Sequence, residues 1–219
     1  MDIRRAVPGD AEALARVHVA CWRAAYAGLL PRPFLDELNL AVRLDQWRRH
    51  LADPARPAVD HVLASPEAGV VGFVTAGPSF GDVPGYDAEI FALYLVPAHQ
   101  GRGWGRALLG AAARTLDHRG LRSAVIWALR DNPACGFYRR LGGVPVAHQF
   151  LHLERQTVPE VAYGWRNLAA LSGRLHRPGP VPASRWPKRR PADRAAATRT
   201  PSASPPPGPP RAASGWTAR

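Results

Sequence analysis

Three glycines at alternate positions constrain the fold of this chain more than any other feature. Gly101, Gly103 and Gly105 follow a β-rich run and precede a helical stretch. Glycine adopts positive φ angles easily and lets another group approach the backbone closely. The first N–H groups of a helix have no partner within it and the helix dipole is positive there, so an anion binds well. Because Arg102 and Arg106 add positive charge, the segment predicts a phosphate-binding strand–loop–helix unit.

The glycine spacing distinguishes three kinds of phosphate-binding loop. A Walker loop needs Gly-Lys-Ser or Gly-Lys-Thr after its glycines, and the chain has neither. A dinucleotide fingerprint has the form G-x-G-x-x-G, whereas the glycines here have the form G-x-G-x-G and lie deep in the chain. The third pattern, Q/R-x-x-G-x-G/A, is satisfied by Gln100, Gly103 and Gly105. An ordinary tight connection between a strand and a helix is the remaining interpretation.

The hydrophobic periodicity predicts a mixed α/β fold. Leu14, Val17 and Cys21 recur at helical spacing, and the run Gly69–Ala76 is typical of a strand. The predicted strands cover residues 2–7, 61–65, 69–76, 88–96, 121–129, 144–153 and 158–165, and the predicted helices cover residues 11–27, 33–51, 103–119 and 132–141. This order implies a sheet of about seven strands flanked by helices.

The composition changes near the C-terminal end. From Arg174 onward the apolar periodicity fades, and Pro, Arg, Ala and Ser dominate. Residues 174–219 hold ten Arg and Lys against one acid, so they carry +9 of the formal net charge of +12. Such a segment cannot bury a core. We therefore expect one domain over residues 1–170 and a disordered Pro/Arg-rich tail over residues 171–219. Any contact with nucleic acid would depend on this tail, and a solvated extension is favoured.

The cysteine and histidine patterns bear on the compartment and on metal binding. Cys21 and Cys135 lie far apart without a CxxC motif, which suggests a reducing compartment. The N-terminus has no apolar signal segment, and no run approaches the roughly 18 apolar residues that a membrane span needs. The eight histidines show no ligand spacing. We expect a cytoplasmic protein with no metal site and no membrane contact.

The chain resembles the GNAT superfamily of N-acetyltransferases, whose members bind the pyrophosphate of acetyl-CoA on such a glycine loop. The resemblance covers about residues 2–168. Glu89–Pro97 is similar to the fourth strand of the family, and Asn132–Gly143 is similar to its Asn…Phe-Tyr…Leu-Gly segment. Trp22–Pro31 resembles the start of one bacterial branch, and Glu160–Trp165 resembles the closing strand. The resemblance implies the GNAT fold with a mostly antiparallel sheet, and acetyl-CoA as co-substrate.

The resemblance also implies where acetyl-CoA binds. Backbone groups of Leu93, Tyr94 and Leu95 would pair with the pantetheine arm in a gap between the fourth and fifth strands, which a bulge in the fourth strand often accompanies. Asn132 would contact the pantetheine region, or it is a turn or N-cap residue before a proline. The loop residues implied in binding the coenzyme are Gln100, Gly101, Arg102, Gly103, Trp104, Gly105 and Arg106.

Two residues are candidates for proton transfer. Tyr138 matches the frequent general acid of the family, which protonates the departing thiolate. The alternative is a core tyrosine, and in many members one more residue separates the Asn from this Tyr. An alkylammonium has a pKa of about 10.4, so it must lose a proton before it attacks. Some members carry a Glu on the fifth strand, but Ile126–Leu129 contains no acid. Glu89 is therefore the candidate general base, with a solvated Glu at a strand start as the alternative.

The acceptor site is less defined. Trp22 and Tyr26 are one helical turn apart, near where the family binds acceptors, or they form an aromatic core stripe. The expected activity is transfer of the acetyl group to a primary amine, of a small molecule or a protein N-terminus, by direct attack. The alternatives are a catalytically weak acyl-CoA-binding regulator and a nucleic-acid-associated protein that acts through its tail. A homodimer is also an open expectation.

Overall fold

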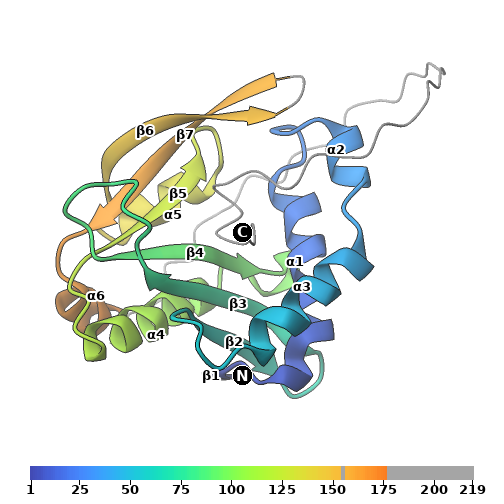
Figure 1. Cartoon of the computed structure of the whole chain (residues 1–219), viewed down its shortest axis with the longest axis horizontal. Coiled ribbons are helices and arrows are strands. Elements are labelled where there is room, and N and C mark those ends of the chain that lie inside the picture. Colours follow the sequence, from blue (N-terminus) through green and yellow to red (C-terminus); the bar gives the residue numbers. More distant parts are fainter. Residues whose placement is uncertain (154–155, 177–219) are drawn as a thin grey trace.

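The computed structural model describes residues 1–153 and 156–176, which form one seven-stranded sheet with helices on both faces (Figure 1). The strand order is β1-β2-β3-β4-β5-β7-β6, and only β4 and β5 run parallel. The strands are β1 (Asp2–Arg5), β2 (Val59–Ser65), β3 (Gly69–Pro78), β4 (Ala88–Leu95), β5 (Ala124–Leu129), β6 (Val144–Leu153) and β7 (Gln156–Trp165). The helices are α1 (Ala11–Ala25), α2 (Arg32–Asp36), α3 (Leu40–Ala52), α4 (Trp104–His118), α5 (Ala134–Arg140) and α6 (Leu168–His176), with short 3₁₀ helices η1 (Pro8–Asp10) and η2 (Pro97–His99). The mixed, mostly antiparallel sheet and its flanking helices confirm the predicted fold class.

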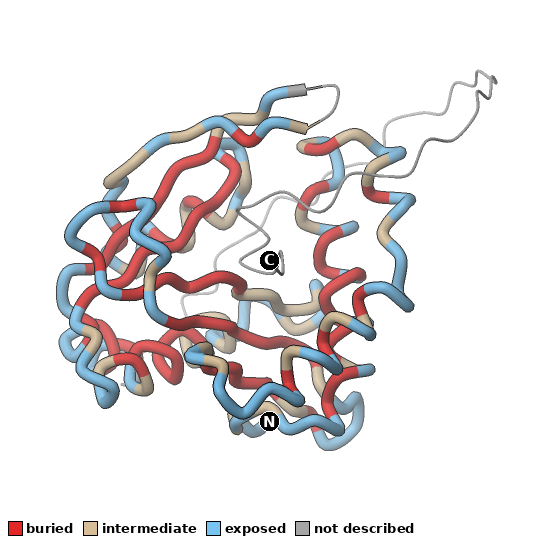
Figure 2. The backbone as a smooth tube through the Cα atoms, viewed as in Figure 1, coloured by how far each residue is buried: buried red, intermediate tan, exposed pale blue. Residues whose placement is uncertain are grey.

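The core has two main layers, one on each face of the sheet. Trp47 of α3 packs with Phe73 and Ala92 on one face, beneath α1 and α3. Leu109 of α4 and Ile90 of β4 belong to the cluster on the other face, beneath α4 and α6. Figure 2 shows the buried residues following the strands and the helix sides that face them. The apolar stripe of each helix is thus removed from water against a nearly continuous apolar sheet.

The predicted helix over residues 33–51 is in fact two helices, α2 and α3. Asn39 precedes α3, and its side-chain oxygen accepts hydrogen bonds from the backbone N–H groups of Ala41 and Val42 at 2.8 and 3.2 Å. Asn is one of the preferred N-cap residues because it satisfies the unpaired donors of the first turn. The apolar spacing alone did not reveal this break.

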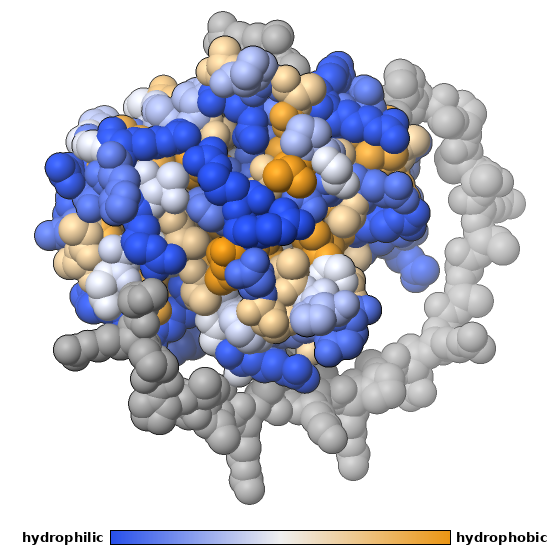
Figure 3. All heavy atoms as spheres, turned by 90° about the horizontal axis from the view of Figure 1, so that it is seen from below, coloured by the Kyte–Doolittle hydropathy of each residue, from blue (hydrophilic) through white to orange (hydrophobic). Residues whose placement is uncertain are grey.

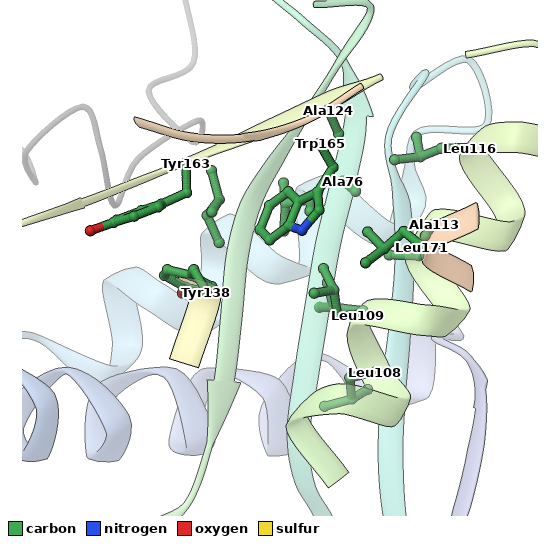
Figure 4. Close-up of a cluster of buried hydrophobic side chains, with 14 of the residues drawn as sticks. Ala76, Leu108, Leu109, Ala113, Leu116, Ala124, Tyr138, Tyr163, Trp165 and Leu171 are labelled. Carbon is green, nitrogen blue, oxygen red and sulfur yellow. The ribbon is translucent and has the colours of Figure 1, made fainter. Parts of the chain in front are cut away.

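Helix α6 crosses the domain boundary that the sequence predicts at residue 170. Leu168 and Leu171 are fully buried in the cluster beneath α4, and Figure 4 shows Leu171 beside Ala113 of α4. The packed domain therefore continues through α6. Residues 177–219, with most of the predicted tail and the nucleic-acid alternative that depends on it, lie outside the described residues.

Strands β4 and β5 separate soon after they meet. Their parallel pairing consists of two residue pairs, Ala88 with Ala124 and Glu89 with Val125. Beyond Glu89, β4 pairs with β3 and with no other described strand, and Figure 1 shows β5–β7 turning away from β1–β4. The gap between the fourth and fifth strands that the family resemblance implies is therefore present.

A bulge in β4 accompanies this gap. Thr75 of β3 pairs with Ala92 and Ala76 pairs with Ile90, so Phe91 has no partner on β3. The extra residue reverses which side chains face which helical layer. Ile90 lies in the cluster beneath α4, whereas Ala92 lies in the cluster beneath α1 and α3. The bulge thus re-aims the second half of β4 beside the gap.

Candidate active site

The glycine loop opens α4 with a row of backbone N–H groups. Gly101 and Gly103 have φ angles of +75° and +83°, in the region that glycine adopts without steric cost. The carbonyl of Gly103 accepts the first hydrogen bond of the helix from Ala107 N–H at 3.0 Å. Within the described residues, the backbone N–H groups of residues 101–105 donate to no backbone carbonyl. These donors and the helix dipole together form a site suited to a phosphate.

Side chains next to the glycine loop connect it to neighbouring elements. The Gln100 Nε2–H donates to the Leu95 carbonyl oxygen at 2.8 Å, which ties the loop to the end of β4. Arg102 is exposed, and Arg106 donates to the backbone carbonyl of Arg174 in α6. Gly105 of α4 lies against the Phe137 ring of α5, where an added Cβ would be at an ordinary van der Waals distance of 3.4 Å. The partly buried Trp104 packs against the cluster beneath α4.

The backbone of β4 along the gap pairs with no described strand on the side that faces β5, although the Leu95 carbonyl accepts the Gln100 hydrogen bond. Leu93 and Leu95 pack their side chains against the cluster beneath α4, and Tyr94 packs on the opposite face. Their side chains are therefore core residues, as the simpler interpretation holds. Their backbone groups act independently of the side chains and lie beyond the last β4–β5 pair. An extended ligand entering the gap would meet this strand edge.

Tyr138 lies on the α4 side of the gap. It is 6% exposed, and its ring lies 5.8 Å from the ring of Tyr163 and 6.3 Å from that of Trp165 (Figure 4). Its hydroxyl makes no hydrogen bond with another described residue. Burial raises the pKa of Tyr138, and the proximity of Tyr26 raises it further. The phenol is therefore protonated at neutral pH and has a proton to donate.

Glu89 lies on the opposite face of the sheet, at the point where β4 and β5 separate. Its neighbours Ala88 and Ile90 belong to the cluster beneath α4, and alternate side chains of a strand point to opposite faces. Glu89 is 6% exposed and forms no ion pair among the described residues. Burial raises its pKa to about 7, and the acids Asp82 and Glu160 contribute. Glu89 is therefore a buried carboxyl with a pKa of about 7, and not the solvated Glu at a strand start that the alternative describes.

Glu160 of β7 is a second buried acid, which the sequence patterns did not single out. Its neighbour Val161 faces the cluster beneath α4, so Glu160 faces the same side of the sheet as Glu89. It is 1% exposed, and burial raises its pKa to about 7. The Gln149 Nε2–H donates to Glu160 Oε2 at 2.8 Å, while Oε1 is buried without a partner among the described residues. The only available signal was an acid within an otherwise apolar strand.

The two aromatic residues predicted on α1 have different surroundings. Tyr26 is 9% exposed, and its hydroxyl lies 3.1 Å from that of Tyr94 of β4. Burial raises the pKa of Tyr26 to about 12. Trp22 is fully buried beside Tyr26, with Arg43 over its ring at 5.8 Å from the ring centre. Trp22 is thus a core residue that offers no surface to a ligand, as the aromatic-stripe alternative describes.

Asn132 makes the contacts of a turn residue. Its side-chain oxygen accepts a hydrogen bond from the Ala134 N–H at 2.9 Å, and its carbonyl oxygen accepts one from the Cys135 N–H at 2.9 Å. These bonds start α5 after Pro133 and fix the position of Tyr138 one helical turn later. The side-chain amide N–H groups of Asn132 donate to no other described residue, so they can serve a ligand.

Two further properties concern the described residues as a whole. No three His, Cys, Asp or Glu side chains among them gather as a metal-binding group. Residues 1–153 and 156–176 also contain no helix with the length and apolar character needed to cross a bilayer. The face shown in Figure 3 mixes mainly hydrophilic residues with small, scattered hydrophobic patches.

A phosphate-type loop beside a gap in a mixed sheet agrees with an acyltransferase. The chain belongs to the acetyltransferase (GNAT) family, whose profile matches residues 16–143. The family assignment agrees with the resemblance seen in the sequence.

Individual relatives agree with this family. The uncharacterized N-acetyltransferase YuaI of Bacillus subtilis is 34% identical over 176 residues, which cover 80% of this chain and 98% of that protein. Mycothiol acetyltransferase of an Arthrobacter species is 28% identical over 145 residues, which cover 65% of this chain and only 42% of that protein. Among solved structures, the PaiA N-acetyltransferase of Thermoplasma acidophilum in complex with coenzyme A has a TM-score of 0.56 at 18% identity, covering 75% of this chain and 98% of that chain. At this identity the last comparison shows the fold alone.

Proposed function

We propose that this protein transfers the acetyl group of acetyl-CoA to a primary amine of a small molecule or a protein N-terminus. The observation that carries the proposal is the glycine loop, whose unpaired backbone donors lie at the end of β4 beside the β4–β5 gap. The pyrophosphate of acetyl-CoA binds residues 101–106. The pantetheine arm follows the free edge of β4 at residues 93–95, with the Asn132 amide beside it, and carries the thioester toward Glu89 and Tyr138.

The reaction proceeds by direct attack. Glu89, ionised above its raised pKa of about 7, accepts the proton of the ammonium, either directly or through a water. The amine nitrogen then attacks the thioester carbonyl carbon, and the C–S bond breaks with its electron pair going to sulfur. Tyr138 donates its proton to the thiolate. The nitrogen loses its second proton to water as the amide forms, and water returns a proton to the Tyr138 phenolate. No enzyme side chain forms a bond to the acetyl group in this scheme.

The protonation states of Glu89 and Tyr138 suit their proposed roles as base and acid. A base whose pKa lies near the working pH is ionised often enough to act and still basic enough to accept a proton. The buried phenol has no acceptor among the described residues to compete for its proton. Glu89 and Tyr138 lie on opposite faces of the sheet. Glu89 can therefore accept the proton of the acceptor amine while Tyr138 protonates the leaving thiolate.

Coenzyme binding and turnover test the proposal separately. Calorimetry should show coenzyme A binding to the folded protein, and a thiol-release assay with acetyl-CoA and a panel of amines should show turnover. Coenzyme binding without turnover on any amine would favour the acyl-CoA-binding regulator. A folded protein with no affinity for coenzyme A would refute the proposal altogether.

A further inference from the structure

The acceptor side of the sheet carries two buried carboxyls, and neither forms an ion pair with another described residue. Glu89 and Glu160 form no salt bridge, and the charges that raise the pKa of Glu89 are themselves acidic. Removing a carboxylate from water is costly unless an opposite charge compensates for it. The described part of the chain therefore supplies no cationic partner for either carboxyl.

The strand register places the two carboxyls along one line. Glu89 pairs with Val125 and Glu160 pairs with Leu129, so both flank β5, on opposite sides of it. Val125, Trp127 and Leu129 alternate along β5 and face the same way, which puts Trp127 between the two acids. At about 3.3 Å per residue the two backbone positions are about 13 Å apart along the strand. The carboxyl groups nevertheless interact electrostatically.

Two polar atoms on this line lack partners. Glu160 Oε1 and Trp127 Nε1 are buried, and neither has a hydrogen-bond partner among the described residues. Glu160 is 1% exposed and Trp127 is 8% exposed. The indole face suits an ammonium group through cation–π attraction. An unpaired, buried carboxylate oxygen is the acceptor that an ammonium N–H requires.

The site lies one side chain below the surface. Gln149 of the edge strand β6 is only partly buried, and its side-chain amide donates a hydrogen bond to Glu160 Oε2. Displacing this neutral amide by an ammonium replaces a neutral donor with a charged one, which makes a stronger hydrogen bond to a carboxylate. Tyr26 lies near this region, since it belongs to the same buried cluster as Leu129, which pairs with Glu160.

We propose that the acceptor is an aliphatic diamine, with Glu89 receiving the proton of the attacking amine and Glu160 binding the second ammonium group over the Trp127 ring. This inference rests on the proposed acetyl transfer for the role of Glu89. The second ammonium neutralises the carboxylate that the fold leaves unpaired, and a monoamine does not.

A matched series of ligands tests this on the full-length protein loaded with coenzyme A. At pH 8 both carboxyls are ionised and the amines are protonated. Calorimetry should show 1,6-diaminohexane binding about 10- to 100-fold more tightly than hexylamine, the range expected for one added charge-assisted hydrogen bond. 6-Aminohexanoate, with a carboxylate at the far end, should bind more weakly than hexylamine.

Variants locate the effect. Glu160→Gln should remove the preference for the diamine and leave hexylamine affinity within about threefold, whereas Glu12→Gln, an exposed Glu of α1, should change neither. Equal binding of diamine and monoamine by the wild type would overturn the inference, even if Glu160→Gln does not fold. A preserved preference in folded Glu160→Gln would overturn it too. Diamine binding without acetyl transfer would refute the proposed function instead, and efficient acetylation of hexylamine without a diamine preference would refute only this inference.

Discussion

Substitution of one loop glycine by alanine separates the cost in stability from the cost in coenzyme binding. Gly103 and Gly120 flank the two ends of α4, each with φ +83°, and a Cβ at either position would meet nothing within 4 Å. An L-residue in this left-handed region costs about 1–2 kcal/mol. Because no steric clash adds to this, Gly103→Ala and Gly120→Ala should lower the free energy of unfolding equally. For a domain of this size the melting temperature should fall by roughly 2–8 °C in each variant.

Coenzyme binding should distinguish the two variants. The backbone N–H groups around Gly103 are the proposed pyrophosphate donors, whereas Gly120 lies at the far end of the helix. Loss or misalignment of one charge-assisted hydrogen bond should weaken coenzyme A binding about 10- to 100-fold in Gly103→Ala. Gly120→Ala should remain within about twofold of the wild type. Calorimetry with coenzyme A and thermal melts of both variants make the comparison. Equal coenzyme affinity in the two variants would refute the placement of the phosphate on this loop.

Three further predictions concern the acid–base pair and α6. The pKa of Glu89 is raised to about 7 and its ionised form is the base, so kcat/KM should fall as pH drops through about 7, and Glu89→Gln should lose this step along with most of the activity. Tyr138→Phe should lower kcat by about 10²- to 10⁴-fold, as for loss of a general acid. Coenzyme affinity and melting temperature should not change, because the hydroxyl has no hydrogen bond to lose. An unaltered kcat would make Tyr138 a core residue only. Leu171→Ala should cost about 2–5 kcal/mol of unfolding free energy, measured by denaturant melts, whereas Leu40→Ala on the surface of α3 should cost far less; equal costs would contradict the docking of α6 as part of the core.

Local patterns predicted most of the elements and the glycine loop of the candidate site. The glycine spacing at residues 101–105 identified the start of α4, and the alternation of apolar residues located the strands to within a few positions. The break before α3 had a signal in Asn39, a strong N-cap residue that apolar spacing does not register. The missed helix α6 had its own signal in Leu168, Leu171 and Leu175 at helical spacing, but it adjoins a tail whose composition suggested disorder.

The sequence by itself determined the local chemistry of this protein: where the chain bends, which backbone N–H groups are left unpaired, and which strand and helix flank them. Only the tertiary structure decided that Trp22 is sealed in the core and that Glu160 lies along the same face as Glu89. The physical reason is that pairing between β4, β5 and β7 is non-local. Burial and strand register across these contacts set the pKa of each carboxyl, and no periodicity within a single segment encodes them.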